Sequence, residues 1–245
     1  QRDFEKIPGA PIAYWVPENF IDLFGKDKRL GDEIITREGM ATADNNRFLR
    51  IWAEVSTDNL KLDAVDNSDA ESSGAKWFPY EKGGSGRKWY GNQTFVVNWK
   101  NGGEEIKNNV DPSTGRVRSH NYNGDYAFKE GLTWAYISSR GITVRYSPSG
   151  LLFDAKGPKA FSDGPLEYYA ALLNSSVSEY ALQVFSQTMD FKLGEVESIP
   201  LKYGSDTEQI ISLSGICIES AKKDWDSRET SWDFTQHPLI QQNAP

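Results

Sequence analysis

Positively charged and amide side chains lie close together in the segment "STGRVRSHNYNGD", residues 113–125. Arg116, Arg118, Asn121 and Tyr122 stand there among residues that favour turns. In the major groove of DNA, Arg donates two hydrogen bonds to guanine, and Asn pairs with adenine. We therefore predict a loop that enters a groove and reads base edges. The alternative is an exposed loop with incidental charge.

A second group of candidate residues lies in "GGSGRKWY", residues 83–90. The glycines let the backbone approach a ligand closely, so Arg87 and Lys88 are candidates for contacts with phosphate groups. Trp89 and Tyr90 are candidates for stacking on a base or on a displaced strand. Two other interpretations stay open: a solvated hairpin tip for the cations, and a core position for the rings.

Further polar residues are weaker candidates for contacts with DNA. Arg140 and Arg145 flank "GITV", a predicted strand, and this position suits contacts with backbone phosphates better than base reading. Lys100 is a candidate of the same kind. Asn45 and Arg47 lie in "DNNRFLR", where a DNA contact and a structural role are both open.

The distribution of charge allows local anion binding although the whole chain is acidic. The 245 residues carry a net charge of −8, which disfavours a general nucleic-acid binder because phosphate affinity comes from Lys and Arg. Between Lys82 and Arg145, however, ten Lys and Arg stand against five Asp and Glu, a local net charge of +5. A basic centre can act as a localised anion-binding face. Alternatively, these charges scatter over the folded surface.

The sequence lacks the motifs that usually carry catalysis. The two histidines, His120 and His237, have no nucleophile signature beside them. The run "KGGSGRK" does not have the spacing of a Walker loop, and no GxGxxG motif follows a predicted strand. We therefore expect this chain to be non-catalytic, with no cofactor or metal site of its own.

Cysteine usage and hydropathy predict where the protein resides. Cys217 is the single cysteine, so no internal disulfide can form, and we expect a reducing, cytoplasmic location. No apolar run is long enough to predict a membrane span, and no signal peptide is recognisable. The chain starts at Gln1 and its first methionine is Met40, so we expect a piece of a longer protein.

The pattern of apolar residues predicts an α+β fold with a β-rich centre and helices packed in the C-terminal part. Short runs such as "TFVVNW" and "ITVRYS" are separated by turn residues and predict a mixed or antiparallel sheet. Helical spacing begins after Gly164 and returns near residues 206–225. We divide the chain into an N-terminal segment (1–55), an acidic loop (56–75), a β-rich domain with a helix at 165–187 (76–203), and a C-terminal helical segment and tail (204–245).

Several segments share a pattern when they are read together: residues 39–55, 76–99, 131–161 and 171–201, with the tail "KKDWDSRETSWDFTQHPL" at 222–239. These segments resemble the target-recognition region of PglX-like adenine-specific DNA methyltransferases from BREX phage-defence systems. More distantly, they resemble the specificity parts of Type IIG and TaqI-like enzymes. Residues 42–45 read Thr-Ala-Asp-Asn where relatives often show Thr-Gly-Asp-Asn, so Ala43 departs from the family pattern at a turn.

This resemblance implies a DNA-reading portion that is separate from the portion that transfers a methyl group. In the family, the catalytic half holds an S-adenosylmethionine loop and an Asn-Pro-Pro-Tyr-type motif for the extruded adenine. Neither motif is present here, so we expect S-adenosylmethionine in the parent enzyme only. The implied partners are double-stranded DNA, the methyltransferase half of the same chain and other defence-system proteins.

Two other classes of function stay open at this point. Eight Trp residues and a β-rich centre also suit a carbohydrate-binding or other ligand-binding module, although the absence of a secretion signal disfavours it. A docking domain for other proteins of a defence complex is compatible with DNA recognition. We take sequence-specific DNA recognition for a methyltransferase as the leading hypothesis.

Overall fold

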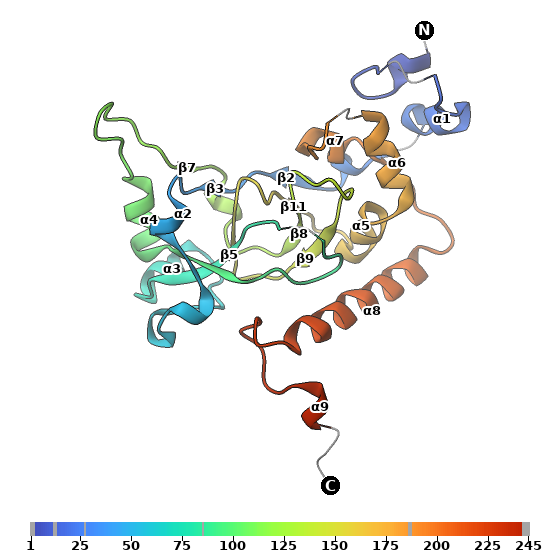
Figure 1. Cartoon of the computed structure of the whole chain (residues 1–245). Coiled ribbons are helices and arrows are strands. Elements are labelled where there is room, and N and C mark those ends of the chain that lie inside the picture. The colour runs from blue at the N-terminus through green and yellow to red at the C-terminus, as the bar shows by residue number, and fades with distance from the viewer. Residues whose placement is uncertain (1–2, 12–13, 27, 85, 186–187, 242–245) are drawn as a thin grey trace.

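The chain forms an α+β fold in which two four-stranded sheets lie at the centre and helices gather at both ends (Figure 1). The α+β class predicted from the sequence is confirmed. The computed structural model describes residues 3–11, 14–26, 28–84, 86–185 and 188–241.

The first sheet is mixed and forms the core of one half of the molecule. Its strands, in spatial order, are β10 (Leu152–Phe153), β5 (Trp77–Glu81), β6 (Phe95–Asn98) and β4 (Leu49–Ile51). β10 runs parallel to β5, whereas the other neighbours are antiparallel. The helices of this half are α2 (Asn45–Phe48), α3 (Asn67–Ser72) and α4 (Lys100–Lys107). The core includes Phe48, Phe78, Val97, Ile106 and Phe128, each fully buried.

The second sheet is antiparallel and forms the core of the other half. Its order is β2 (Ile35–Arg37), β11 (Lys159–Phe161), β8 (Gly131–Trp134) and β9 (Val144–Ser147). Leu132, Trp134 and Val144 are buried against Tyr169 and Leu173 of helix α5 (Leu166–Leu173). The next helices in this half are α6 (Ser176–Phe185) and α7 (Leu193–Glu197). The apolar spacing after Gly164 therefore builds a helical layer on this sheet, as two successive helices.

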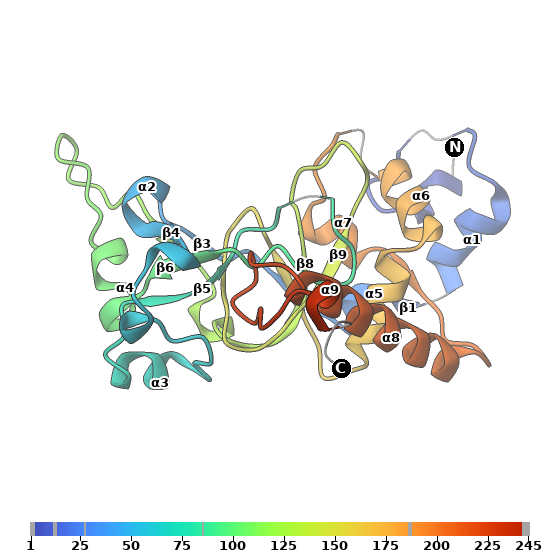
Figure 2. The same ribbon diagram turned by 60° about the horizontal axis from the view of Figure 1, so that its bottom comes forward.

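The N-terminal and C-terminal helices pack on the second half (Figures 1 and 2). Rings of α1 (Glu18–Lys26) meet rings of α6 edge to face, with Phe20 and Tyr180 centroids 4.8 Å apart. The long helix α8 (Thr207–Asp226) packs along α5. The small elements are η1 (Asp3–Lys6), β1 (Lys28–Arg29) paired with β12 (Pro200–Leu201), η2 (Leu30–Asp32), η3 (Trp52–Glu54), η5 (Gly124–Tyr126) and α9 (Pro238–Gln241).

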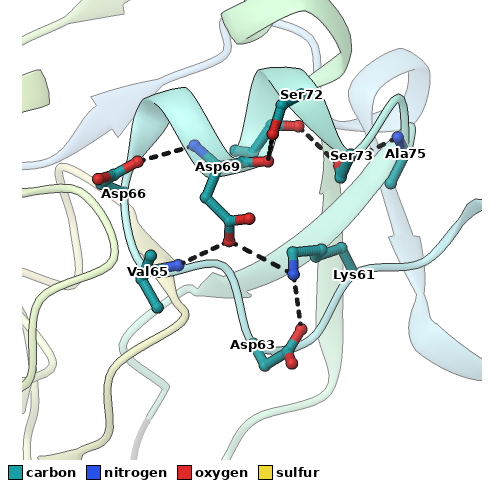
Figure 3. A network of polar contacts seen from close by, with 9 residues as sticks. Lys61, Asp63, Val65, Asp66, Asp69, Ser72, Ser73 and Ala75 are labelled. Carbon is teal, nitrogen blue, oxygen red and sulfur yellow. Dashed lines mark hydrogen bonds and ion pairs between the residues drawn. The ribbon is translucent and has the colours of Figure 1, made fainter.

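Residues 56–75, predicted as an acidic loop, contain η4 (Thr57–Asn59) as well as α3. Their acidic side chains hold the backbone in place, as Figure 3 shows. The Asp66 carboxylate accepts from the Asp69 backbone N–H at 2.7 Å and caps α3. The Asp69 carboxylate in turn lies 3.3 Å from the Lys61 ammonium. Ala70 is buried in the first core, so the segment is part of the packed half.

Charged groups are buried where the two sheets meet. Glu81 at the end of β5 accepts a hydrogen bond from the Ser147 hydroxyl of β9. Arg145, also in β9, is fully buried and donates to the Gly83 carbonyl. Lys159 of β11 is fully buried and donates to the Lys129 carbonyl at 2.8 Å. Burial lowers the pKa of Lys159 to about 8, because removal from water disfavours the ammonium.

Lys159→Met should change how stability depends on pH. The pKa of Lys159 is about 8 in the fold and near 10.5 as the ordinary value. Between these values the unfolded chain binds more protons than the folded chain, so the free energy of unfolding rises with pH. The variant should lose this rise in urea unfolding between pH 7 and 10, whereas the exposed control Lys223→Met should keep it. Parallel pH profiles for wild type and Lys159→Met would contradict the prediction.

The turn that follows β3 (Met40–Ala41) contains a strained residue. Ala43 has a φ of 58°, in the left-handed region that favours glycine. The next residue, Asp44, caps α2 by accepting from the Arg47 backbone N–H at 3.1 Å. The cap therefore fixes the conformation that strains Ala43.

Ala43→Gly should increase the free energy of unfolding by about 0.5–1 kcal/mol, because relief of the left-handed strain exceeds the extra entropy of an unfolded glycine. Ala41→Gly, in the neighbouring strand, is the matched control and should destabilise the protein. Urea unfolding at neutral pH measures both changes. A loss of stability in Ala43→Gly equal to that in Ala41→Gly would show that the turn is not strained.

Candidate nucleic-acid interface

Residues 108–122 follow α4, include β7 (His120–Asn121) and project from the body of the molecule, and we call them the arm (Figure 1). Val110 and Val117 form an antiparallel bridge that brings its two sides together. At its base, the Asn109 side-chain amide donates to the Thr42 carbonyl at 3.3 Å. β7 pairs with β3 in the antiparallel direction. The arm is thus a narrow ribbon fixed at its base.

Asp111 organises the turn at the end of the arm. Its carboxylate accepts from the Ser113 backbone N–H at 2.8 Å and pairs with Arg118 at 2.6 Å. The pKa of Asp111 is lowered, first by the Ser113 hydroxyl and then by Arg118. The Asp111 carboxylate therefore orients Arg118. Arg116, in contrast, is exposed, and its side chain has no partner among the described residues.

The inner end of the arm presents polar and aromatic groups to solvent. His120 and Tyr122 stack with their ring centroids 5.3 Å apart and only 2° between their planes. Tyr122 is half exposed, and Asn121, between the two rings in sequence, is exposed. Side chains alternate between the two faces of an extended strand, so we infer that Asn121 points away from the stacked pair. Arg116, Arg118, Asn121 and Tyr122 are therefore all accessible on one projecting element.

Arg87 and Lys88 are held by other parts of the fold. The Arg87 guanidinium donates to Asp224 of α8 at 2.6 Å and lies over the Trp225 ring, 5.2 Å from its centre. The Lys88 ammonium donates to the Asn174 carbonyl at 3.0 Å, although the side chain is exposed. Arg87 thus fastens the end of α8, a role that the local sequence did not indicate.

Trp89 and Tyr90 also contribute to the fold. The Trp89 backbone bonds to both neighbours of Arg145 in β9, donating to Val144 at 2.9 Å and accepting from Tyr146 at 2.8 Å. Its ring packs against the second core. Tyr90 is buried, which raises the pKa of its hydroxyl to about 12. The core position that the sequence left open for these two rings is the one the structure shows.

The remaining candidates lie in different environments. Lys100, at the start of α4, is exposed. Arg140 is exposed beside a hollow of about 400 Å³ that Gly141 and Glu179 also line. Arg145 is inaccessible to a phosphate because its guanidinium is buried between the sheets, which differs from the expected phosphate contact. The accessible candidates are therefore the arm residues, Lys100, Arg140 and Lys88.

The residues at the end of α8 make contacts that no local sequence pattern predicts. Asp224 and Trp225 are 137 and 138 positions from Arg87 along the chain, yet both contact it. Trp52 in η3 also donates its indole N–H to the Thr230 carbonyl at 2.9 Å. In the sequence, this tryptophan and aspartate stand out only as part of the family resemblance. No local pattern indicated which partners they would have.

Comparisons with known proteins support that resemblance. No family model matches the chain. It is 44% identical over 243 residues to the adenine-specific methyltransferase PglX of Lacticaseibacillus casei strain Zhang. It is 36% identical over 247 residues to the adenine-specific methyltransferase BrxX of Escherichia coli O9:H4 strain HS. The chain is therefore similar to one segment of each of these two methyltransferases. Both alignments cover 98% of the chain, which spans only about one fifth of each relative.

Both alignments run over almost the whole chain, so the aligned range includes the arm and the end of α8. The predicted resemblance to PglX-type methyltransferases is thereby confirmed. Within the described residues, no helix is both long and apolar enough to cross a membrane.

Arg87→Ala should lower the free energy of unfolding by about 1 kcal/mol, since the pair with Asp224 is partly exposed and the stacking on Trp225 is also lost. Asp224→Ala should have a similar effect, and the double variant should lose less than the sum. The exposed neighbour Lys223→Ala is the control. Urea unfolding of all four variants provides the measurement.

The effect of Arg87→Ala should also depend on pH. Arg87 is the main cause that lowers the pKa of Asp224 below its usual 3.8. The pair therefore stabilises the fold above the unfolded pKa and loses its effect as pH falls through the folded pKa. If Arg87→Ala left the free energy of unfolding unchanged but weakened DNA binding, Arg87 would be a DNA contact and would not stabilise the end of α8.

Proposed function

We propose that this PglX-like segment recognises double-stranded DNA for an adenine-specific methyltransferase and does not itself transfer the methyl group. The observation that carries the proposal is the arm, a projecting ribbon with exposed Arg, Asn and Tyr side chains, in a chain similar to PglX and BrxX. A two-stranded ribbon fits the major groove of B-DNA, where base pairs can be distinguished by their donors and acceptors.

The arm residues suit separate tasks in such a complex. The donors of the Arg116 guanidinium have no partner in the described part of the chain and match the acceptors of guanine. Asn121 carries an amide that matches adenine. Arg118 is fixed by Asp111, so it suits a phosphate or base at a defined position. Lys100 and Arg140 are exposed on the body of the molecule and suit contacts with the DNA backbone.

The remaining chemistry is assigned to the parts of the parent enzyme outside this chain. We propose that S-adenosylmethionine binds there and that the methyltransferase half is a partner of this segment. Exposed Leu213 and Ile216 on α8 support a contact with that half, because adjacent apolar side chains favour burial at an interface. Other proteins of a BREX-type defence system are further proposed partners, given the names of the two relatives.

The test is fluorescence anisotropy of the 245-residue chain with duplex DNA of mixed sequence at several salt concentrations. The logarithm of the affinity should fall linearly with the logarithm of the salt concentration, because bound cations release counterions. Arg116→Ala should then cost roughly 1–3 kcal/mol of discrimination between sequences if it reads a base.

Arg228→Ala is the matched control, since Arg228 is similarly exposed but pairs with Asp224 on α8. It should bind DNA like the wild type. Equal loss of affinity for all sequences in Arg116→Ala would assign that residue to phosphates. If Arg116→Ala and Asn121→Ala both bound DNA with wild-type affinity and sequence preference, the arm would not contact DNA.

A further inference from the structure

The turn at residues 42–46, which we call the α2 turn, is joined to the base of the arm. Ala41, just before this turn, pairs with His120 of β7. The Thr42 carbonyl accepts from the side chain of Asn109 at the other side of the arm. Thr42 of the α2 turn and its neighbour Ala41 are therefore joined to the two sides of the arm at its base.

Internal hydrogen bonds hold the backbone of the α2 turn. The Thr42 hydroxyl donates to the Asn45 side-chain carbonyl at 2.8 Å. Asp44 caps α2 through the Arg47 backbone N–H. The Asn46 carbonyl accepts from the Arg50 guanidinium at 2.7 Å. The turn is thus a fixed platform rather than a loose loop.

Asn46 differs from its neighbours because its side chain is exposed and has no partner among the described residues. The Asn45 amide oxygen is already used by Thr42. Arg47 lies over the Phe48 ring and 3.7 Å from Glu105. Asn46 alone among these three keeps both a free amide donor and a free acceptor, which is the pair needed for a bidentate contact with adenine.

The surface beside Asn46 has the chemistry of a nucleotide contact. Asn46 borders a hollow of about 450 Å³ between α2 and β4, lined also by Arg50, Lys82 and Phe95. Lys82 is 3.3 Å from Asp154, and Arg50 lies over the Trp77 ring, so both cations are held in place near the rim. Glu54, also at the hollow, is occupied by the Ile51 backbone N–H at 3.0 Å. Cations and an amide therefore share the rim of one hollow.

We propose that the α2 turn is a second base-reading element beside the arm and that Asn46 contacts the edge of an adenine. This inference rests on the proposed function and adds a specificity-determining residue to it. The arm reads one part of the site. The α2 turn, attached to the base of the arm, reads an adjacent part. The cations at the hollow hold the DNA backbone beside it.

The test compares sequence preference in the wild-type chain and in Asn46→Ala. Each protein is incubated with a randomised duplex pool, and bound molecules are sequenced. The wild type should prefer adenine at a position that Asn46→Ala reads about tenfold less strongly. Affinity for unrelated duplexes should stay unchanged. Asn46→Gln, which keeps the amide, should retain part of the preference.

Gln209→Ala is the matched control, because Gln209 is an exposed amide on α8, far along the chain from the arm. It should leave every sequence preference unchanged. Circular dichroism of each variant confirms that the exposed substitutions leave the fold intact.

Three results would overturn the proposal. Equal loss of affinity for all sequences in Asn46→Ala would make Asn46 a phosphate contact. If Asn46→Ala kept the wild-type sequence preference while Arg116→Ala changed it, the arm would read bases and the α2 turn would not. Absence of DNA binding by the wild-type chain at low salt would overturn the proposed function together with this inference.

Discussion

Burial of charge between the two sheets is the constraint on which much of the structure depends. Arg145 is fully buried, and burial lowers its pKa while the nearby Glu81 carboxylate opposes that change. Its guanidinium bonds to the Gly83 carbonyl and lies 3.4 Å from the Arg87 carbonyl. Arg145 therefore positions the glycine-rich segment, because a buried guanidinium needs nearby acceptors: the two carbonyls serve its terminal nitrogens, whereas its Nε has no partner among the described residues.

The position of that segment then determines where the C-terminal helix ends. Arg87 extends from the segment to Asp224 and Trp225 of α8. Gly91 lies so close to Trp225 that an added Cβ would come within 3.0 Å of its ring. The buried Arg145 thus holds the backbone of Gly83 and Arg87. The Arg87 side chain in turn holds the end of α8, which is distant in sequence. The arm differs, since its hydrogen bonds to the body lie at its base and its arginines are exposed.

Local patterns predicted many of the regular elements. The runs "TFVVNW" and "ITVRYS" contain β6 and β9, because alternating and β-branched residues suit a half-buried sheet. Where a helix was predicted at 165–187, the described residues form two helices, α5 and α6, and residues 186–187 lie outside the described part of the chain. Asn174 lies at the break and bonds through its side chain to both the N–H and the carbonyl of Val144. The spacing of apolar residues cannot predict this contact with the sheet, because it depends only on neighbours along the chain.

In the candidate site, sequence and tertiary structure likewise determine different properties of single residues. The sequence alone determined which residue types were available, namely a basic, aromatic centre in an acidic chain and a turn-rich segment with Arg and Asn. Only the tertiary structure decided which of these groups stay accessible. Arg87 pairs with an aspartate 137 positions away and Arg145 is buried, whereas Arg116 projects on the arm. The physical reason is that burial and ion pairing depend on contacts between residues far apart in sequence, while composition and spacing record only what each segment can offer.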